Sequence, residues 1–399
     1  TSPDLPPQRM PLTELLAPAG SPEALRAAIA AGADAVYLSG KRFGARKYAA
    51  NFSEDEIADA VRTAHSRGVR VYVTVNTLVH DRELRNAAEY LVRLYAAGVD
   101  AVLIQDTGIA ALAREIVPDL ALHASTQMTI HNSASVLRAA ETGFFRVVLA
   151  RELPLSEVRE IARRTARAGI GLEVFAHGAL CYSYSGQCLL SSVIGGRSGN
   201  RGMCAQPCRK PYALVTGDTD RYGRPGPLRE LETPGRYLLS PRDLCTERHL
   251  PDLVRSPVVS LKIEGRMKSP EYVAIVVSTY RRALDAIAAG IGNIRPDAGQ
   301  DLALAFSRGF TRGYLFGDRY ESLMARDAPN NRGICIGSVI KQDRDGTVTI
   351  RREGTLVPET GDGLLFSAPA AGEEWGFLLN TAPVTRGKAL VLAVPRRVT

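Results

Sequence analysis

Long hydrophobic runs are missing from this sequence of 399 residues. No stretch approaches the roughly eighteen apolar residues that a membrane-spanning helix needs, so no such helix is expected. The N-terminal segment is polar and rich in proline, without the charged and apolar segments of a secretory signal. We therefore expect a cytoplasmic protein, in a reducing compartment where stable disulfides are rare.

Motifs of several common enzyme classes are also absent. No G-x-G-x-x-G or P-loop pattern follows the first expected strand, which argues against a dinucleotide- or nucleotide-binding fold. The H-E-x-x-H pattern of zinc-dependent proteases does not occur. Lys and Arg together exceed Asp and Glu by eight (50 against 42), a modest positive charge that is compatible with an anionic partner such as RNA.

Cysteine is scarce, but five of the six cysteines fall in one window: Cys181, Cys188, Cys204, Cys208 and Cys245. No two of them are separated by only two residues, as paired zinc ligands usually are. Cys335 stands alone in an apolar stretch and is expected to be an inert thiol in a strand. For the other five, two interpretations stay open: inert buried thiols, or loop cysteines that converge on one iron–sulfur cluster.

Short apolar runs alternate with amphipathic segments along most of the chain. Buried parallel strands read as continuous apolar runs, and the expected strands are 14–17, 35–38, 69–75, 101–105, 120–124, 146–150, 171–175 and 258–263. The helices expected between them are 22–31, 54–67, 81–97, 107–117, 133–142, 155–168 and 246–254. Ser21 and Ser53 supply N-cap chemistry for the first two helices. This α/β pattern predicts a TIM-like (β/α)8 barrel rather than an open doubly wound sheet.

The alternating pattern is interrupted once and stops well before the last residue. We expect a flexible lead-in at 1–11, a barrel at 12–295 with a cysteine-bearing insertion at 178–257 before its last strand, a helical connector at 296–332 and a small β-barrel domain at 333–399. In the last of these, short alternating runs are separated by Asp-Gly and Gly-Asp-Gly turns. Connections as long as the insertion are usually functional or disordered, and its cysteines favour function.

Polar residues recur near the ends of the expected strands, where barrels of this kind carry their active sites. They are Glu14, Asn76, Gln105, Asp106, His123 to Gln127, Glu173, His177 and Glu264 to Arg266. Each alone is as readily a structural polar group, but their recurrence predicts a site. We expect Asn76, His123, Gln127 and Arg266 to bind substrate, together with Arg46 after the second strand.

The segment 173–191 resembles closely the signature of the collagenase-like proteins of peptidase family U32. The pattern is Glu-x-Phe-x-x-Gly-Ala-Leu-Cys, four further residues, and Gly-x-Cys-x-Leu-Ser, and it is matched from Glu173 to Ser191. The segments 14–20, 123–132 and 261–269 also look like family motifs. The resemblance therefore extends over most of the chain.

The resemblance implies an iron–sulfur protein that hydroxylates its substrate without oxygen and uses prephenate as the hydroxyl donor. Similar members modify ribosomal RNA, transfer RNA or a quinone-precursor ring. Carried over to this sequence, the ligands of a [4Fe–4S] cluster are Cys181, Cys188, Cys204 and Cys245, with Cys208 as the fifth cysteine outside the set. The sequence around Cys204 to Tyr212 most resembles that of the family branch that acts on ribosomal RNA.

The favoured interpretation is hydroxylation of an RNA base, in 23S ribosomal RNA or in transfer RNA. The alternatives are a U32-type peptidase and a hydroxylase of a quinone-precursor ring. We expect Arg266 to hold a prephenate carboxylate, His177 to transfer protons and Glu173 to take part in catalysis. The basic residues Arg197, Arg201, Arg209 and Lys210 are candidates for holding RNA phosphates.

Overall fold

The computed structural model describes the whole chain except residues 1–12, 292–297, 344–345, 369–372 and 396–399. The chain divides into two compact units, Thr1–Asn331 and Arg332–Thr399. The expected lead-in at 1–11 lies outside the described residues. So do residues 292–297, where the sequence predicts the change from the barrel to the connector.

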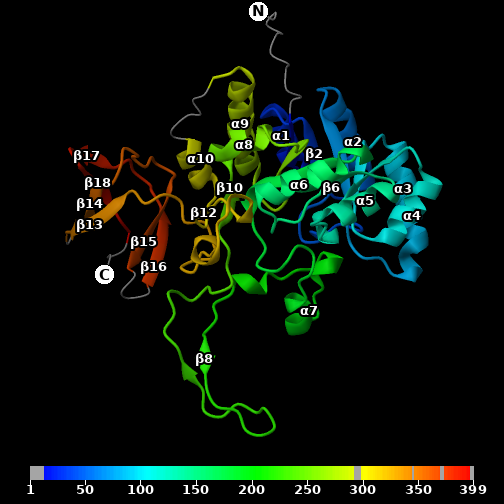
Figure 1. The fold of residues 1–399 in the computed structure, drawn as a ribbon. Coiled ribbons are helices and arrows are strands. Elements are labelled where there is room, and N and C mark those ends of the chain that lie inside the picture. Colours follow the sequence, from blue (N-terminus) through cyan, green and yellow to red (C-terminus); the bar gives the residue numbers. More distant parts are fainter. Residues whose placement is uncertain (1–12, 292–297, 344–345, 369–372, 396–399) are drawn as a thin grey trace, which may run out of the picture. The chain divides into compact units, whose positions relative to one another are not determined.

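Eight parallel strands form a closed barrel in the first unit (Figure 1). They are β1 Glu14–Pro18, β2 Ala35–Leu38, β3 Arg70–Val75, β4 Ala101–Ile104, β5 Ala121–Ala124, β6 Phe144–Val148, β7 Gly171–Ala179 and β11 Ser260–Ile263. The last strand closes the barrel because it pairs with both β1 and β7, with Ser260 opposite Glu14 on one side and Glu173 on the other. The TIM-like barrel that the sequence predicts is confirmed.

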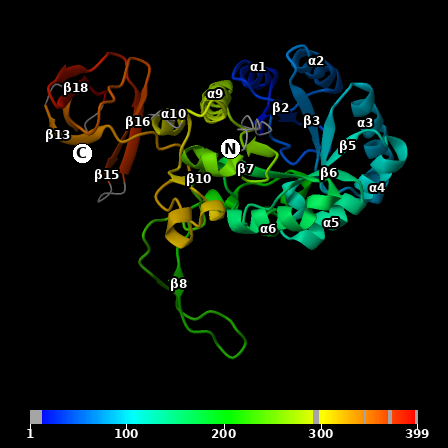
Figure 2. The ribbon, with the colours of Figure 1, turned by 45° about the horizontal axis from the view of Figure 1, so that its top comes forward.

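Helices follow the strands and surround the barrel (Figure 2). They are α1 Pro22–Ala30, α2 Glu54–His65, α3 Leu84–Ala96, α4 Thr107–Ile116, α5 Ser133–Glu141, α6 Leu155–Thr165, α8 Leu250–Val254 and α9 Pro270–Ala288. The predicted caps are present, since the Ser21 side chain accepts a hydrogen bond from the Ala24 amide and Ser53 forms a capping box with Glu56. Such caps satisfy amides that the first helical turn leaves unpaired.

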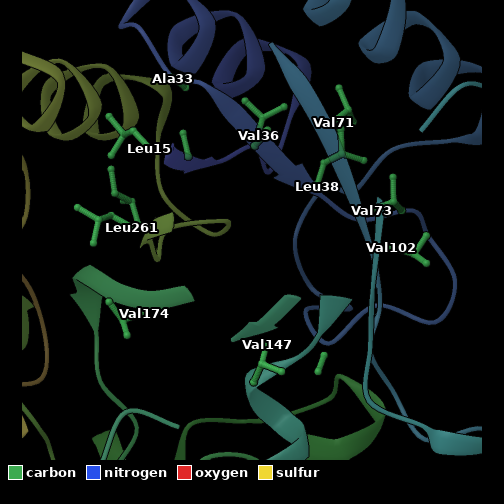
Figure 3. Close-up of a cluster of buried hydrophobic side chains, with 14 of the residues drawn as sticks. Leu15, Ala33, Val36, Leu38, Val71, Val73, Val102, Val147, Val174 and Leu261 are labelled. Carbon is green, nitrogen blue, oxygen red and sulfur yellow. The ribbon is translucent and has the colours of Figure 1, made fainter. Parts of the chain in front are cut away.

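Successive residues of each barrel strand point to opposite sides, which creates two apolar layers. In β2, Val36 and Leu38 join the large core between barrel and helices, whereas Ala35 and Tyr37 face the barrel interior. Figure 3 shows the helix-facing side chains from successive strands, with Leu15, Val36 and Val71 among those labelled. The inner set is smaller and leaves space that polar side chains fill.

The insertion before the last barrel strand contains little regular structure. Strand β7 runs four residues beyond the expected end at 175, and the chain then forms α7 Leu190–Gly195, the short ribbon β8 Val215–Thr216 and β9 Arg229–Glu230, and β10 Asp243–Cys245. The ribbon extends away from the barrel in both views (Figures 1 and 2). Strand β10 pairs antiparallel with the extension of β7, and β12 Phe310–Thr311 pairs with β10.

The rest of the first unit and the second unit follow α9. Helix α10 Ala298–Ala305 precedes β12, and the second unit contains β13 Gly337–Gln342, β14 Thr347–Arg352, β15 Gly363–Ala368, β16 Glu373–Leu378, β17 Val384–Arg386 and β18 Ala389–Ala393. These form a four-stranded sheet in the order β13-β14-β18-β17 and a separate pair, β15 with β16. The predicted C-terminal β unit is confirmed. Within the described ranges, no helix has the length and apolar character to cross a membrane.

Candidate functional site

Buried charges fill the barrel interior. Arg146 donates to Glu14 (2.5 Å) and to Glu173 (3.2 Å), and the Lys262 ammonium donates to the other Glu173 oxygen (3.0 Å). Burial alone would raise the pKa of Glu173, but Lys262 and Arg146 outweigh it and hold that pKa at about 2. Glu173 is therefore ionised at neutral pH, and its two oxygens are already bonded. The sequence predicts Glu173 at the barrel mouth, but the structure places it deeper, within the barrel.

A second polar layer lies closer to the C-terminal ends of the strands. The Tyr37 hydroxyl donates to the Ile263 carbonyl (3.0 Å) and to Glu264 (3.2 Å), and Arg46 donates to the other oxygen of Glu264 (3.3 Å). Burial would raise the pKa of Glu264, yet Arg46 and then Arg266 lower it overall. Glu264 is thus an ionised carboxylate that orients Arg46 at the barrel mouth.

Arg266 is a buried cation at the mouth without an ion-pair partner in the described residues. Its side chain is 5 % exposed, and one guanidinium nitrogen donates to the Thr74 hydroxyl (3.1 Å). Within the described ranges its Nε atom has no hydrogen-bond partner and no carboxylate lies within ion-pair distance. Burial, followed by repulsion from Arg46, lowers the pKa of Arg266 to about 10. A buried guanidinium without a direct ion pair is costly, so this position suits an anionic ligand.

Asn76 and Gln127 lie at the mouth, but they differ in what they can offer a ligand. The Asn76 amide group accepts from the Ala45 amide (3.0 Å) and donates to Ser125 (3.2 Å), so it joins the segments after β2, β3 and β5. The Gln127 side-chain oxygen is buried without a partner in the described part of the chain. Asn76 therefore links the loops of the mouth, whereas the Gln127 side-chain oxygen can still accept a hydrogen bond from a ligand.

His123 lies deeper than the sequence predicts. Its ring packs edge-on against Tyr72 with centroids 4.8 Å apart, inside the barrel. Burial, and then the nearby Arg146, lower the pKa of His123 to about 3. The ring is therefore neutral at physiological pH and packs in the interior layer rather than at the mouth.

His177 faces away from the other candidates. The pairing of β7 with β11 shifts register next to His177, and its ring lies among the rings of Tyr272 (6.1 Å), Tyr280 (5.5 Å) and Phe310 (5.8 Å). Burial lowers the pKa of His177 to about 4. The structure thus places this histidine against α9 and β12 and does not bring it together with Arg266.

The insertion covers the barrel mouth because four different barrel loops hold it. Arg201 forms an ion pair with Glu83 after β3 (2.7 Å), and the Gly202 carbonyl accepts from the Lys47 amide after β2 (3.0 Å). Ser185 bonds with both Thr129 after β5 and Glu152 after β6. The close approach also requires Gly186, because its φ is +77° and a Cβ atom there would lie 2.3 Å from the Gln127 carbonyl oxygen.

The Cys208 thiol interacts electrostatically with three other thiols of the insertion. Burial raises the pKa of the Cys208 thiol to about 11; Arg209 opposes this rise, and the thiols of Cys181, Cys204 and Cys188 add to it. Glu264 is the main cause of the raised pKa of Arg46, but Cys204 and Cys181 also contribute. Cys181, Cys188 and Cys204 are therefore within electrostatic range of Cys208, and Cys181 and Cys204 are also within range of Arg46 at the barrel mouth.

Cys245, the expected fourth ligand, has different neighbours. It lies opposite His177 across the pairing of β10 with β7, and burial raises its pKa to about 11 while the nearby groups are Glu247 and Tyr280. The electrostatic neighbours of Cys208 thus include three thiols, whereas those of Cys245 are Glu247, Tyr280 and Arg248. Cys335 is exposed just before β13, so the expectation of a buried thiol in a strand is wrong.

The insertion supplies donors that suit iron or another soft metal, but not a finished metal site. Among the residues that the structure describes, no three His, Cys, Asp or Glu side chains are arranged to hold a metal ion. The thiols are the donor type that iron–sulfur clusters use.

The basic residues of the insertion divide into structural and free ones. Arg201 bonds with Glu83, and Arg209 donates to Ser240 (2.7 Å) and to the Leu180 carbonyl (3.1 Å). Arg197 and Lys210 are exposed and have no ion pair in the described part of the chain. Only these two of the four predicted phosphate-binding cations remain free to meet a ligand.

The sequence interpretation missed two residues of the mouth, Tyr37 and Thr74. Both are polar residues at inward positions of strands, since Tyr37 alternates with Val36 and Leu38, and Thr74 lies two residues from both Tyr72 and Asn76. That alternation was the available signal. Buried polar side chains on the inner face of a closed barrel need hydrogen-bond partners, which other side chains, the backbone, water or a ligand can supply.

Comparison with known proteins gives consistent matches. Residues 20–325 match the profile of peptidase family U32. The chain is 39 % identical over 380 residues to the 23S rRNA 5-hydroxycytidine C2501 synthase of Escherichia coli (strain K12), covering 93 % of this chain and 55 % of that protein. It is 36 % identical over 366 residues to the tRNA hydroxylation protein P1 of Bacillus subtilis (strain 168), covering 89 % of this chain and 83 % of that protein.

A third relative has a name from another class of enzyme. The chain is 33 % identical over 407 residues to the Collagenase of Porphyromonas gingivalis (strain ATCC BAA-308 / W83), covering 96 % of this chain and 95 % of that protein. The chain thus spans about half the length of the Escherichia coli relative but nearly all of this one.

Proposed function

The chain belongs to peptidase family U32, and on that premise we propose that it hydroxylates a base in RNA. The favoured substrate is 23S ribosomal RNA, with transfer RNA as the next choice. The cysteines of the insertion would hold a [4Fe–4S] cluster, which would supply the redox or Lewis-acid chemistry, and prephenate would donate the hydroxyl group without oxygen. Two relatives named for RNA hydroxylation support the substrate class.

The observation that carries the proposal is the buried guanidinium of Arg266, which shares the barrel mouth with Arg46. Arg266 and Arg46 lie at the mouth, and Arg46 interacts electrostatically with the thiols of Cys204 and Cys181. A donor with two carboxylates would supply the negative charge that Arg266 lacks, and guanidinium groups bind carboxylates through paired hydrogen bonds. Gln127 would offer its free acceptor to a hydroxyl or amine of the ligand.

A peptidase is the second candidate, because one relative is named Collagenase. A cysteine peptidase needs a thiol activated by a histidine, and such thiols have a depressed pKa. Cys245 lies opposite His177, but burial moves its pKa in the other direction, to about 11. The His177 ring is enclosed by aromatic side chains, so this pair lacks the features of a nucleophile and its base.

Loss of the protein should remove one modification from cellular RNA. Nucleoside mass spectrometry of ribosomal and transfer RNA from a deletion strain is expected to show one nucleoside without its added oxygen. Reintroducing the gene should restore it, and reintroducing an Arg266→Ala variant should restore it poorly. If every hydroxylated nucleoside stays intact while quinone precursors accumulate, the ring-hydroxylase alternative is correct instead.

Arg266→Ala is expected to weaken prephenate binding by at least about tenfold, since one charge-assisted hydrogen bond contributes roughly 1.5–3 kcal/mol. Isothermal titration calorimetry on the purified protein measures this. The thermal unfolding temperature should change little, because Arg266 has no ion pair in the described part of the chain. Arg138→Ala, at an exposed arginine of α5, is the matched control. Unchanged affinity in Arg266→Ala would show that another cation holds the donor.

A further inference from the structure

Three tyrosines are exposed on the segments that surround the covered mouth. Tyr48, in the loop after β2, is 54 % exposed, and Tyr182 and Tyr184, in the cysteine loop, are 53 % and 47 % exposed. Tyrosine rings are large apolar surfaces that proteins normally bury against other groups. Their exposure beside a candidate site therefore marks a surface that can bind a flat partner.

Bonds to the barrel loops place these rings on two sides of the insertion. Tyr48 lies beside the segment between Cys188 and Cys204, because the Arg197 guanidinium is 4.8 Å from its ring centroid and the Lys47 amide bonds to Gly202. On the other side, the Tyr184 ring meets His131 edge-on, with centroids 6.0 Å apart. The rings thus flank the thiol-bearing segment where a long substrate would approach.

The charges next to Tyr48 are positive and uncompensated. Arg197 and Lys47 are exposed, and neither forms an ion pair within the described residues. The other cations nearby are already used, since Arg46 is paired with Glu264 and Arg201 with Glu83. Tyr48 therefore presents an exposed ring that carries the Arg197 guanidinium over one face, with Lys47, a cation without an ion pair in the described residues, next to it in the chain.

We propose that Tyr48, Arg197 and Lys47 bind an unpaired nucleotide of a single-stranded RNA segment beside the reacting base. This rests on the proposed function, and it specifies the state of the RNA that the site accepts. An aromatic ring offers a stacking surface to any base, and adjacent cations hold the phosphates of the same strand. A carboxylate-rich peptide would meet the cations but would not use the exposed part of the ring as a stacking surface.

The experiment measures binding of a fluorescently labelled, unstructured oligoribonucleotide of about twelve nucleotides by anisotropy. Tyr48→Ala should weaken binding about tenfold, within the range of one stacked base, while Tyr48→Phe keeps the ring and should bind within about twofold of the unaltered protein. Arg197→Gln should reduce the dependence of log Kd on log salt by about one phosphate contact. Tyr95→Ala is the matched control, because Tyr95 is similarly exposed (45 %) but lies on α3.

The outcomes separate this inference from the proposed function. If the unaltered protein binds the RNA and Tyr48→Ala binds it equally well, the stacking site is wrong while the RNA function stands. If the unaltered protein does not bind single-stranded RNA at all, the RNA function fails and the stacking site fails with it. A loss in Tyr48→Ala that Tyr48→Phe does not share supports the site.

Discussion

Cys204→Ser is expected to yield a colourless protein, whereas the unaltered protein, purified without air, should be brown and contain about four irons per chain. The reason is that Cys204 is exposed at the mouth and within electrostatic range of Cys208, so its thiolate would complete a shared cluster. Iron analysis and the visible absorption spectrum check this. A colourless unaltered protein that binds one zinc would contradict the cluster.

The same measurement decides the fourth ligand. From the neighbours of the two thiols, we expect Cys208→Ser to lose iron and Cys245→Ser to retain most of it. Cys335→Ser is the matched control, because that thiol is exposed in the second unit. If Cys245→Ser loses iron and Cys208→Ser keeps it, the ligand set that the family resemblance implies is correct, and β10 must move when the cluster forms.

Glu173→Gln is expected to destabilise the protein by about 3–5 kcal/mol, the usual cost of removing one partner from a buried ion pair. The change would leave the Lys262 ammonium, 4 % exposed, without its carboxylate, and would remove one of the two carboxylates that Arg146 bonds. Urea unfolding followed by circular dichroism measures the loss. Glu160→Gln is the matched control, because Glu160 pairs with Arg163 and Arg164 on the exposed face of α6 and should matter little.

At low pH, Glu173→Gln and the unaltered protein should have similar free energies of unfolding. The pKa of Glu173 is depressed to about 2 from an ordinary value near 4.3, so its contribution is present above the ordinary value and is lost as pH falls toward about 2. The gap in unfolding free energy should therefore be constant near neutrality and shrink below about pH 4. A variant as stable as the unaltered protein but catalytically inactive would instead support the catalytic role that the sequence predicts.

The barrel could be predicted because its strands and helices have distinct apolar patterns. The expected strand 35–38 agrees with β2, and the expected helix 22–31 ends one residue after α1. Such patterns report which residues face a core, and a closed barrel follows once eight units succeed one another. The insertion has no such pattern, so its path over four barrel loops had to come from the structure.

The candidate site could be predicted only in part, because sequence position does not report depth or direction. Arg46, Asn76, Gln127 and Arg266 were placed at the mouth because they follow strands, and the structure has them there. Glu173 lies inside the barrel because β7 runs four residues beyond its expected end. His123 lies inside because it alternates with Leu122 and Ala124, which face the helices. The direction of the His177 side chain could not be predicted, because the pairing of β7 with β11 shifts register beside it and no local sequence pattern signals such a shift.

The attachment of the insertion to separate barrel loops sets an order of events during synthesis. The contact between Arg201 and Leu78 joins residues 123 positions apart in the chain, and that between Thr129 and Ser185 joins residues 56 apart. Contacts between such distant residues form late, because the intervening chain must first be organised. The thiols would therefore meet only after the barrel has closed, and iron would be delivered to a folded protein rather than nucleate its folding.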